Sequence, residues 1–309
     1  MRYRNDNMLL RIAQGDAFAV AVEYVKRDKF PDLYAAVERY DSYQQHPTHT
    51  KLRPGMYTDD TQMSIAVSEV LLRSPTPTAE IFAEQFYECF RRDPRDGYSR
   101  GFQKILEEAK SPDHMRQLIT PNSNKNGAAM RAVPIGVIKD PNQVVALAAM
   151  QAQVTHATYG GINSAVIVAL MSHFGLYDRR GFISFKGWGN QYCPALEHFS
   201  RPWEGPVNGF YASSDPTGLG VGMNTAWAVW TLLVEETSLM GMMRRLITWG
   251  GDTDSVAAIA WGIGSTRFPD EVLPEFLERD LEVSGNLAYG PTYLKELGKR
   301  LMDAYDIRK

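Results

Sequence analysis

The chain has 309 residues, of which 44% are hydrophobic and 22% charged, and its formal net charge is -3. A chain of this length can bury a full hydrophobic core, whereas so small a net charge creates no field that would attract nucleic acid or an anionic membrane. The only cysteines, Cys89 and Cys193, have no thiol or histidine at metal-ligand spacing, which favours a reducing compartment, the cytoplasm. We expect a soluble globular protein whose partner is a small molecule or another protein.

The N-terminal segment contains no apolar run long enough for a signal sequence. We also expect no stretch elsewhere to be long and uninterrupted enough to span a bilayer, and hence no membrane anchor. No repeat, low-complexity tract or linker divides the sequence. We therefore predict a single domain over residues 1–309.

Helical periodicity runs through most of the chain, as in the spacing of Phe82, Phe86 and Phe90, and strand alternation is almost absent. The sequence predicts an all-α fold of about ten or more helices. In chain order we expect helices near 6–28 and 61–73, then two helices that begin after possible N-caps at Thr78 and Ser99, and another near 126–138. A helix should begin after Asp140, and another should lie within 162–176. The remaining helices are expected near 223–236, 238–249 and 254–266, after Asp270, and near 291–305. The helix within 162–176 is apolar nearly all round, which predicts a central, buried position.

Two segments, 41–57 and 178–222, do not follow the helical pattern. The second is rich in glycine, proline and tryptophan. We expect both to be long surface loops, with a short hairpin near 181–189 as an alternative for part of the second. Loops of this length usually act as lids or rims of functional sites.

The segment from Thr58 to Thr61 reads Thr-Asp-Asp-Thr and places two carboxylates directly before an apolar helix. A capping role is the simplest explanation, because Asp, Thr and Ser are the preferred first residues of helices and carboxylates complement the helix dipole there. One cap, however, requires only one carboxylate.

A second acidic helix start follows a Gly-Gly turn and contains Asp252, Asp254 and Ser255. Both helices are apolar enough to be buried and neither segment supplies a Lys or Arg, so unpaired charge at these positions would be very costly. If the two segments meet in space, a divalent cation is the natural counter-charge, and oxygen ligands favour Mg²⁺ or Mn²⁺ over Zn²⁺. Six such ligands suit two ions that share one carboxylate.

Five separated stretches resemble the ADP-ribosylglycohydrolase family, in the order found in that family. They include "YTDDTQMS", "NGAAMR" and "GGDTDS" and lie at 15–24, 57–64, 122–137, 154–165 and 249–260. The resemblance implies an all-α fold with a binuclear Mg²⁺ or Mn²⁺ centre in a cleft. It also implies hydrolysis of the glycosidic bond that joins ADP-ribose to an acceptor.

The resemblance assigns the metal ligands one by one. The first set is Thr58, Asp59 and Asp60, and the second is Asp252, Asp254 and Ser255. Asp254 is the implied bridge between two ions, and Asp59 and Asp60 count as catalytic residues as well. Ser255 stands where family members commonly have threonine, but either hydroxyl supplies an oxygen.

The same resemblance makes Glu23 the candidate general base or water-mediated ligand. Glu23 follows Asp16 by seven residues, as does the mobile-loop glutamate of the family, and we expect Asp16 to hold that loop by hydrogen bonds. The usual glycine after Gly-Asp-Ala is replaced here, where the chain reads Ala17-Phe18-Ala19. This departure bears on how far Glu23 can reach.

For substrate binding, Ser123, Asn126 and Gly127 match positions that cradle the diphosphate, and Asn and Ser side chains with amides at a helix start can bind an anion. An Asn-Gly pair is also an ordinary turn signal. His156 matches a histidine that contacts the ribose, although a lone helical histidine is more often a core residue. Arg131 could touch phosphate or pair with an acid, and we leave it out of the site.

These assignments imply a metal-dependent hydrolase that removes ADP-ribose from an acceptor by water attack at the anomeric carbon. ADP-ribosyl-arginine on protein is the first candidate, with serine, nucleic-acid and small-molecule linkages as alternatives. Two rival functions stay open. One is phosphoester hydrolysis by the same metals, disfavoured by only six histidines and by the fit of "NGAAMR"; the other is a non-catalytic ADP-ribose-binding protein.

Overall fold

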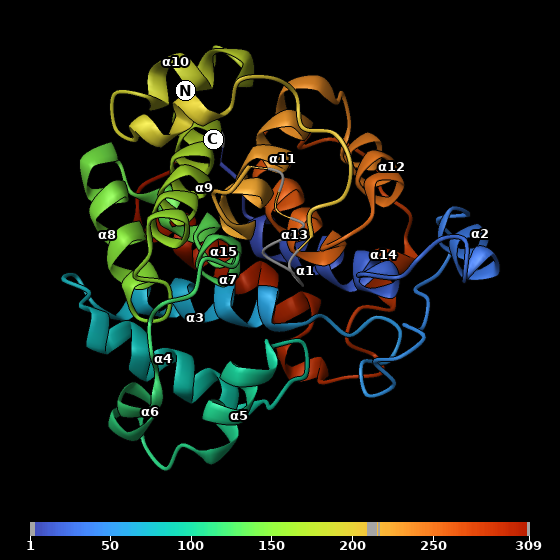
Figure 1. The fold of residues 1–309 in the computed structure, drawn as a ribbon, viewed down its shortest axis with the longest axis horizontal. Helices are drawn as coiled ribbons and strands as arrows, with labels where there is room; N and C mark the ends of the chain where they lie inside the picture. Colours follow the sequence, from blue (N-terminus) through green and yellow to red (C-terminus); the bar gives the residue numbers. More distant parts are fainter. Residues whose placement is uncertain (1–3, 209–214, 216, 308–309) are drawn as a thin grey trace.

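The computed structural model describes residues 4–208, 215 and 217–307, and within these residues the protein is built from helices with no β-strand (Figure 1). The α-helices are α1 (Met8–Ala19), α2 (Pro31–Val37), α3 (Asp59–Arg73), α4 (Ala79–Arg92), α5 (Arg100–Glu108), α6 (Pro112–Leu118), α7 (Gly127–Met130), α8 (Pro141–Gln153), α9 (Tyr159–Tyr177), α10 (Phe185–Gly189), α11 (Val221–Glu235), α12 (Leu239–Trp249), α13 (Thr253–Gly264), α14 (Phe276–Arg279) and α15 (Pro291–Ala304). Short 3₁₀ helices are η1 (Val20–Val22), η2 (Val133–Val137), η3 (Phe182–Ser184), η4 (Pro194–His198) and η6 (Leu287–Tyr289). The predicted all-α fold is confirmed.

Helix α1 packs along α13 more extensively than any other pair of elements in the described part of the chain, and both lie near the middle of the molecule in Figure 1. Gly15 makes this contact possible, because a Cβ at that position would lie 2.7 Å from the carbonyl oxygen of Ala257 on α13. Helix α3 contacts both α1 and α13. The three helices that carry the acidic segments therefore meet in the core.

Helix α9 is the central, buried helix expected within 162–176. It packs against α8, α11 and η2, and nearly all of its residues are buried. By length and composition alone α9 could cross a membrane, so the expectation that no stretch could do so was wrong for this helix. Within the fold, 83% of its apolar window is buried, as in the core helix of a globular protein.

Proline and backbone conformation explain most differences from the predicted helices. Of the helix expected over 6–28, α1 ends at Ala19 and continues only as η1, and the positive φ of 51° at Tyr24 prevents a helix beyond it. The helix expected near 126–138 is divided into α7 and η2, with Pro134 at the start of η2. The helix expected directly after Asp270 is reduced to the four residues of α14, since Pro274 interrupts the segment, and Val272 is 93% exposed.

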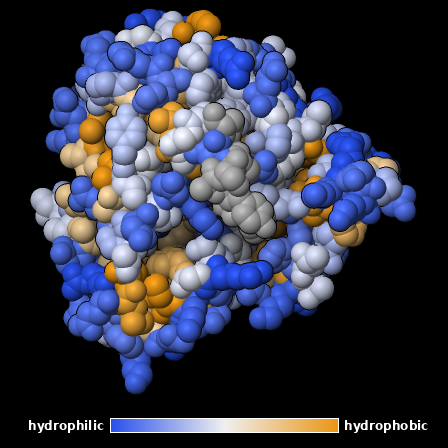
Figure 2. Space-filling view, in the orientation of Figure 1, coloured by the Kyte–Doolittle hydropathy of each residue, from blue (hydrophilic) through white to orange (hydrophobic). Residues whose placement is uncertain are grey.

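The segment 178–222 holds short helices rather than the alternative hairpin. In its described part, η3 and α10 occupy the glycine-rich stretch and η4 follows. The space-filling view in Figure 2 shows a mainly hydrophilic face, with an apolar patch over the region where α4, α5 and α6 lie. One hydrophobic core contains residues from both ends of the chain, from Met8 to Ile307.

Candidate metal centre

Carboxylates from three helices and the end of η1 converge beside the contact between α1 and α13. Oxygen atoms of Asp16, Asp60 and Asp254 lie within 4.8 Å of one another, and so do oxygen atoms of Glu23, Asp252 and Asp254. Asp254 belongs to both groups. The two acidic helix starts therefore meet in space, although Asp60 and Asp254 are far apart in the sequence.

Capping does not account for these carboxylates. The N-cap of α3 is Thr58, whose hydroxyl oxygen accepts a hydrogen bond of 3.3 Å from the backbone N–H of Asp60. Asp252 occupies the N-cap position of α13 but makes no capping hydrogen bond with its side chain. Oδ1 of Asp60 and Oδ1 of Asp254 are both buried without a hydrogen-bond partner.

The electrostatics of the cluster call for a positive counter-charge. Burial raises the pKa of Asp59 to about 8, and the charge of Asp16 adds to this rise. Burial also raises the pKa of Glu23, Asp60 and Asp254 well above the usual range, and neighbouring carboxylates add to each shift. No ion pair among the described residues includes a carboxylate of this cluster.

Asp16 holds the start of α3. Its carboxylate accepts hydrogen bonds from the backbone N–H of Thr58 (3.0 Å) and Thr61 (3.1 Å) and from their hydroxyls (2.9 and 2.6 Å). Burial raises the pKa of Asp16 to about 6, and these hydrogen bonds oppose the rise. We expected Asp16 to hold the Glu23 loop; that expectation was wrong about the segment it holds, which is the Thr58–Thr61 turn.

The remaining predicted ligands differ in how closely they approach the cluster. Asp59 is outside both groups of three carboxylates. Gly97 packs against it, since an added Cβ would lie 2.7 Å from Asp59 Oδ1. The Ser255 side chain opposes the rise in the pKa of Asp60, and the Thr58 hydroxyl donates to Asp60 Oδ2 over 3.2 Å. All three of these predicted ligands are buried.

Glu23 reaches the cluster even though the glycine expected after Gly-Asp-Ala is replaced and the chain reads Phe18-Ala19 there. The turn after it is fixed by Tyr24, whose N–H donates to the carbonyl oxygen of Gly251 (2.8 Å) and whose hydroxyl donates to Asp252 Oδ2 (2.6 Å). Sequence reasoning missed Tyr24. Its position directly after Glu23 was the only available signal.

The four residues predicted to bind substrate lie together beside α7. A Cβ on Gly127 would lie 3.0 Å from Cε1 of His156, and the His156 backbone forms an isolated bridge with Asn122, next to Ser123. Nδ2 of Asn126 is buried without a hydrogen-bond partner. Helix α7 is only four residues long, so any anion here would depend on side chains and amides more than on a helix dipole. Helix α7 also contacts α3 and α13, the helices that carry Asp60 and Asp254.

Arg131 serves the structure around His156. Its guanidinium donates to Gln151 and, over 2.9 Å, to the hydroxyl of Thr155, and it stacks on the ring of Phe86. The Thr155 hydroxyl lies 2.6 Å from Nδ1 of His156. Burial and the nearby charge of Arg131 lower the pKa of His156 to about 3, so this ring is neutral at pH 7.

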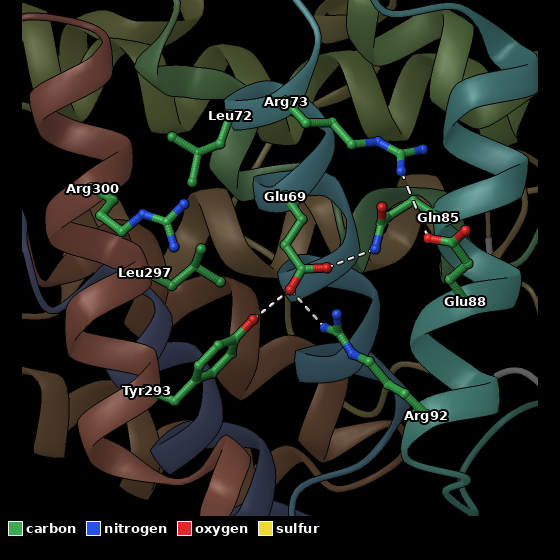
Figure 3. Close-up of a pocket in the computed structure, with 9 residues that line it drawn as sticks. All are labelled: Glu69, Leu72, Arg73, Gln85, Glu88, Arg92, Tyr293, Leu297 and Arg300. Atoms are coloured by element: carbon green, nitrogen blue, oxygen red, sulfur yellow. Dashed lines mark hydrogen bonds and ion pairs between the residues drawn. The ribbon is translucent and has the colours of Figure 1, made fainter.

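A separate surface pocket of about 350 Å³ contains none of these residues. Figure 3 shows Glu69 at its centre, with Gln85, Arg92 and Tyr293 pointing toward it. Glu69 accepts hydrogen bonds from all three side chains. This network joins α3, α4 and α15, and the Glu69 carboxylate is already paired with Arg92.

The donor set of the cluster fits divalent cations. It consists of buried, closely spaced carboxylates with hydroxyls beside them, and two carboxylate oxygens have no other partner. Hard cations such as Mg²⁺ and Mn²⁺ prefer such oxygen ligands. An all-α fold with a carboxylate cluster of this kind defines the class of protein as an all-helical protein with a buried site suited to divalent metal ions.

Comparison with known proteins gives the family. A sequence model of the ADP-ribosylglycohydrolase family matches residues 4–307, and the chain belongs to this family. It is therefore a hydrolase of glycosidic bonds, as the resemblance implied.

Relatives from distant organisms resemble this chain over most of their length. ADP-ribosylhydrolase ARH3 of Homo sapiens is 32% identical over 73% of this chain and 74% of that protein. ADP-ribosyl-[dinitrogen reductase] glycohydrolase of Rhodospirillum rubrum is 23% identical over 89% of each. A solved structure of an ADP-ribosylglycohydrolase-related protein complex matches the fold with a TM-score of 0.72 at 20% identity, covering 98% of both chains.

Proposed function

We propose that this protein is a metal-dependent hydrolase that removes ADP-ribose from a modified acceptor, with ADP-ribosyl-arginine on protein as the preferred substrate. The observation that carries the proposal is the position of Asp254, a buried carboxylate that lies in both groups of closely spaced carboxylates. A carboxylate shared in this way suits two Mg²⁺ or Mn²⁺ ions. The ligands would be Thr58, Asp59, Asp60, Asp252, Asp254 and Ser255.

When bound, the metal ions supply an activated water and bind sugar hydroxyls. Glu23 would take the proton of the attacking water, since its carboxylate lies beside those of Asp252 and Asp254. The remaining carboxylates place negative charge beside the anomeric carbon, where an oxocarbenium-like transition state carries positive charge. Asn126 and Gly127 would orient the diphosphate, and His156 would contact the ribose.

Names of relatives support a protein-linked substrate. The Rhodospirillum rubrum protein is named for ADP-ribosyl-[dinitrogen reductase], a modified protein. The ARH3 proteins are named only as ADP-ribosylhydrolases. These names specify no acceptor residue; we propose arginine, and serine, nucleic-acid and small-molecule linkages are the alternatives that the experiment below distinguishes.

The test is a panel of arginine-linked, serine-linked, DNA-linked and small-molecule ADP-ribosyl substrates, incubated with Mg²⁺, with Mn²⁺ or with EDTA, while released ADP-ribose is measured. We expect release from the arginine-linked substrate that EDTA abolishes. Asp60→Ala and Asp254→Ala should each lower turnover by at least about 10²-fold. The matched control is Asp113→Ala, which removes an exposed carboxylate on α6. Full activity in EDTA or in either cluster variant would contradict the proposal.

We also propose that the protein acts in the cytoplasm as a single folding unit over residues 1–309. Both cysteines are free and buried, which is consistent with a reducing compartment. Measuring the distribution of the tagged protein between cell fractions tests the location.

A further inference from the structure

The segment between α2 and α3 contacts the Glu23 turn through a buried histidine. The rest of this segment is anchored to the body of the protein by Tyr43, whose hydroxyl donates to the carbonyl oxygen of Leu277 over 2.8 Å. Inside the segment, the amide of Gln45 donates to the carbonyl oxygen of Leu52 over 2.8 Å. Leu52 itself is buried. The segment is thus a fixed support and not a free loop.

His46 joins this support to Glu23. Its Nδ1 accepts hydrogen bonds from the backbone N–H groups of Thr48 (3.1 Å) and His49 (2.9 Å). In a neutral ring the proton must therefore lie on Nε2. Nε2 is 3.0 Å from the carbonyl oxygen of Glu23, to which it donates. Burial lowers the pKa of His46, which favours this neutral form.

The peptide group between Glu23 and Tyr24 is consequently held on both sides. Its carbonyl accepts from His46, and its N–H donates to the carbonyl oxygen of Gly251. Tyr24 has a positive φ of 51°, a conformation that costs a residue with a side chain of order 1 kcal/mol or more and persists only where its surroundings fix it. Release of either bond would let this peptide rotate.

We propose that His46 is a positioning residue that keeps the Glu23 carboxylate beside Asp252 and Asp254 by holding the Glu23–Tyr24 peptide. This inference rests on the role given to Glu23 in the proposed function. A general base loses much of its effect when it is displaced by about 1 Å. The segment before α3 thereby contributes to turnover although none of its carboxylates belongs to the cluster.

Two substitutions separate the two hydrogen-bonding sides of His46. His46→Asn keeps an acceptor for Thr48 and His49 near the position of Nδ1 but removes the donor to Glu23. His46→Gln keeps a donor near the position of Nε2 and removes that acceptor. We expect His46→Asn to lower kcat at least about tenfold with little change in KM, whereas His46→Gln stays within about threefold of the parent.

A second readout needs neither metal nor substrate. In metal-free protein, hydrogen exchange of the Tyr24 amide should accelerate at least about tenfold in His46→Asn and remain near the parent rate in His46→Gln. Tyr43→Phe is the matched control, because it removes another hydrogen bond that the segment donates to a distant carbonyl, that of Leu277. It should lower the melting temperature without changing kcat or Tyr24 exchange. If His46→Asn does not fold, the exchange rate of the Tyr24 amide in His46→Gln tests the inference. A rate near that of the parent would support the inference, and a much faster rate would contradict it.

A double-mutant cycle with Glu23→Gln separates this inference from the proposed function. Glu23→Gln should lower kcat by about 10²-fold or more, and His46→Asn should add little to it, because both act through the same carboxylate. If Glu23→Gln is inactive but His46→Asn has parent kcat and exchange, the inference fails and the proposed function stands. If Glu23→Gln is fully active, both the role of Glu23 and this inference fail.

Discussion

Asp254 illustrates how a buried carboxylate can be costly without a metal and necessary with one. Its Oδ1 has no hydrogen-bond partner, and Glu23 and Asp60 raise its pKa in addition to burial. Asp254→Asn keeps the shape and removes the charge. In metal-free protein we expect it to raise the free energy of unfolding by about 1 kcal/mol or more, because removing an uncompensated buried charge stabilises.

The same Asp254→Asn variant should lose the stabilisation that Mn²⁺ gives to the parent protein. Thermal melts of both proteins, with EDTA and with Mn²⁺, measure the two effects together. Asp113→Asn, on the surface, should leave both values unchanged. A variant that melts lower in EDTA and still responds fully to Mn²⁺ would show that Asp254 is not a ligand.

His156 predicts a dependence of stability on pH. Its folded pKa of about 3 lies below the usual value of 6.5, so the unfolded chain binds more protons between these values. The contribution of His156 to stability is therefore present above pH 6.5 and is lost as the pH falls, by about 2 kcal/mol between pH 7 and pH 5.

Urea unfolding of the parent and of His156→Asn at pH 7 and pH 5 tests this prediction. The stability difference between the two proteins should change by about 2 kcal/mol in favour of the variant at the lower pH. Comparing differences cancels the titration of the carboxylate cluster. A difference independent of pH would mean that His156 accepts a proton in the folded protein as readily as in the unfolded one.

Sequence reasoning at the residue scale found the acidic pairs because their residue types and positions before apolar helices are local features. It could not place Tyr24 or His46, since both act through contacts with residues distant in the chain. It also predicted that Asp16 would hold the Glu23 loop, whereas Asp16 holds the Thr58–Thr61 turn. Four hydrogen bonds to Thr58 and Thr61 cross from one helix to the start of another, and no local pattern encodes that contact.

At the scale of elements, the contact between α1 and α13 fixes the geometry of the carboxylates that these helices carry. Gly15→Ala would place a methyl group 2.7 Å from the carbonyl oxygen of Ala257 and force the helices apart. We expect a loss of about 1–3 kcal/mol in stability. A weaker affinity for Mn²⁺ should accompany it, because Asp254 would move away from the Thr58–Thr61 turn that Asp16 holds.

Gly101→Ala is the matched control for this substitution. Gly101 lies in the exposed helix α5, and an added Cβ would meet nothing within 4 Å. This change should stabilise the protein by about 0.5–1 kcal/mol, since alanine favours the helix. Calorimetry for Mn²⁺ binding and urea unfolding measure both variants. If Gly15→Ala and Gly101→Ala had the same stability and the same Mn²⁺ affinity, the close contact at Gly15 would not fix the geometry of the carboxylates.

Helices with a strong apolar period and a clear cap could be predicted, and α4 and α8 begin after Thr78 and Asp140 as expected. Short helices were harder to predict from the sequence. The prediction omitted α2 and α6, which have only seven residues each and so present barely two turns of pattern. The helix expected after Asp270 failed because Pro274 and exposed Val272 outweigh the spacing of its apolar residues.

At the scale of the whole molecule, metal binding should stabilise the fold. Free Mn²⁺ at about 100 times its dissociation constant adds about 2.7 kcal/mol, which corresponds to a rise of about 5 °C in melting temperature. EDTA should reverse the rise. Melting curves over a series of Mn²⁺ concentrations provide the measurement, and a melting temperature independent of Mn²⁺ would contradict a metal centre at this position.

The carboxylates that meet at Asp254 come from opposite ends of the chain. During synthesis the N-terminal members leave the ribosome long before the segment that contains Asp252 and Asp254. If the proposed centre binds an ion, the complete ligand set would exist only after synthesis of α13. A bound ion would then act as a cross-link that closes a very long loop, and the entropy of closing such loops rises only slowly with length.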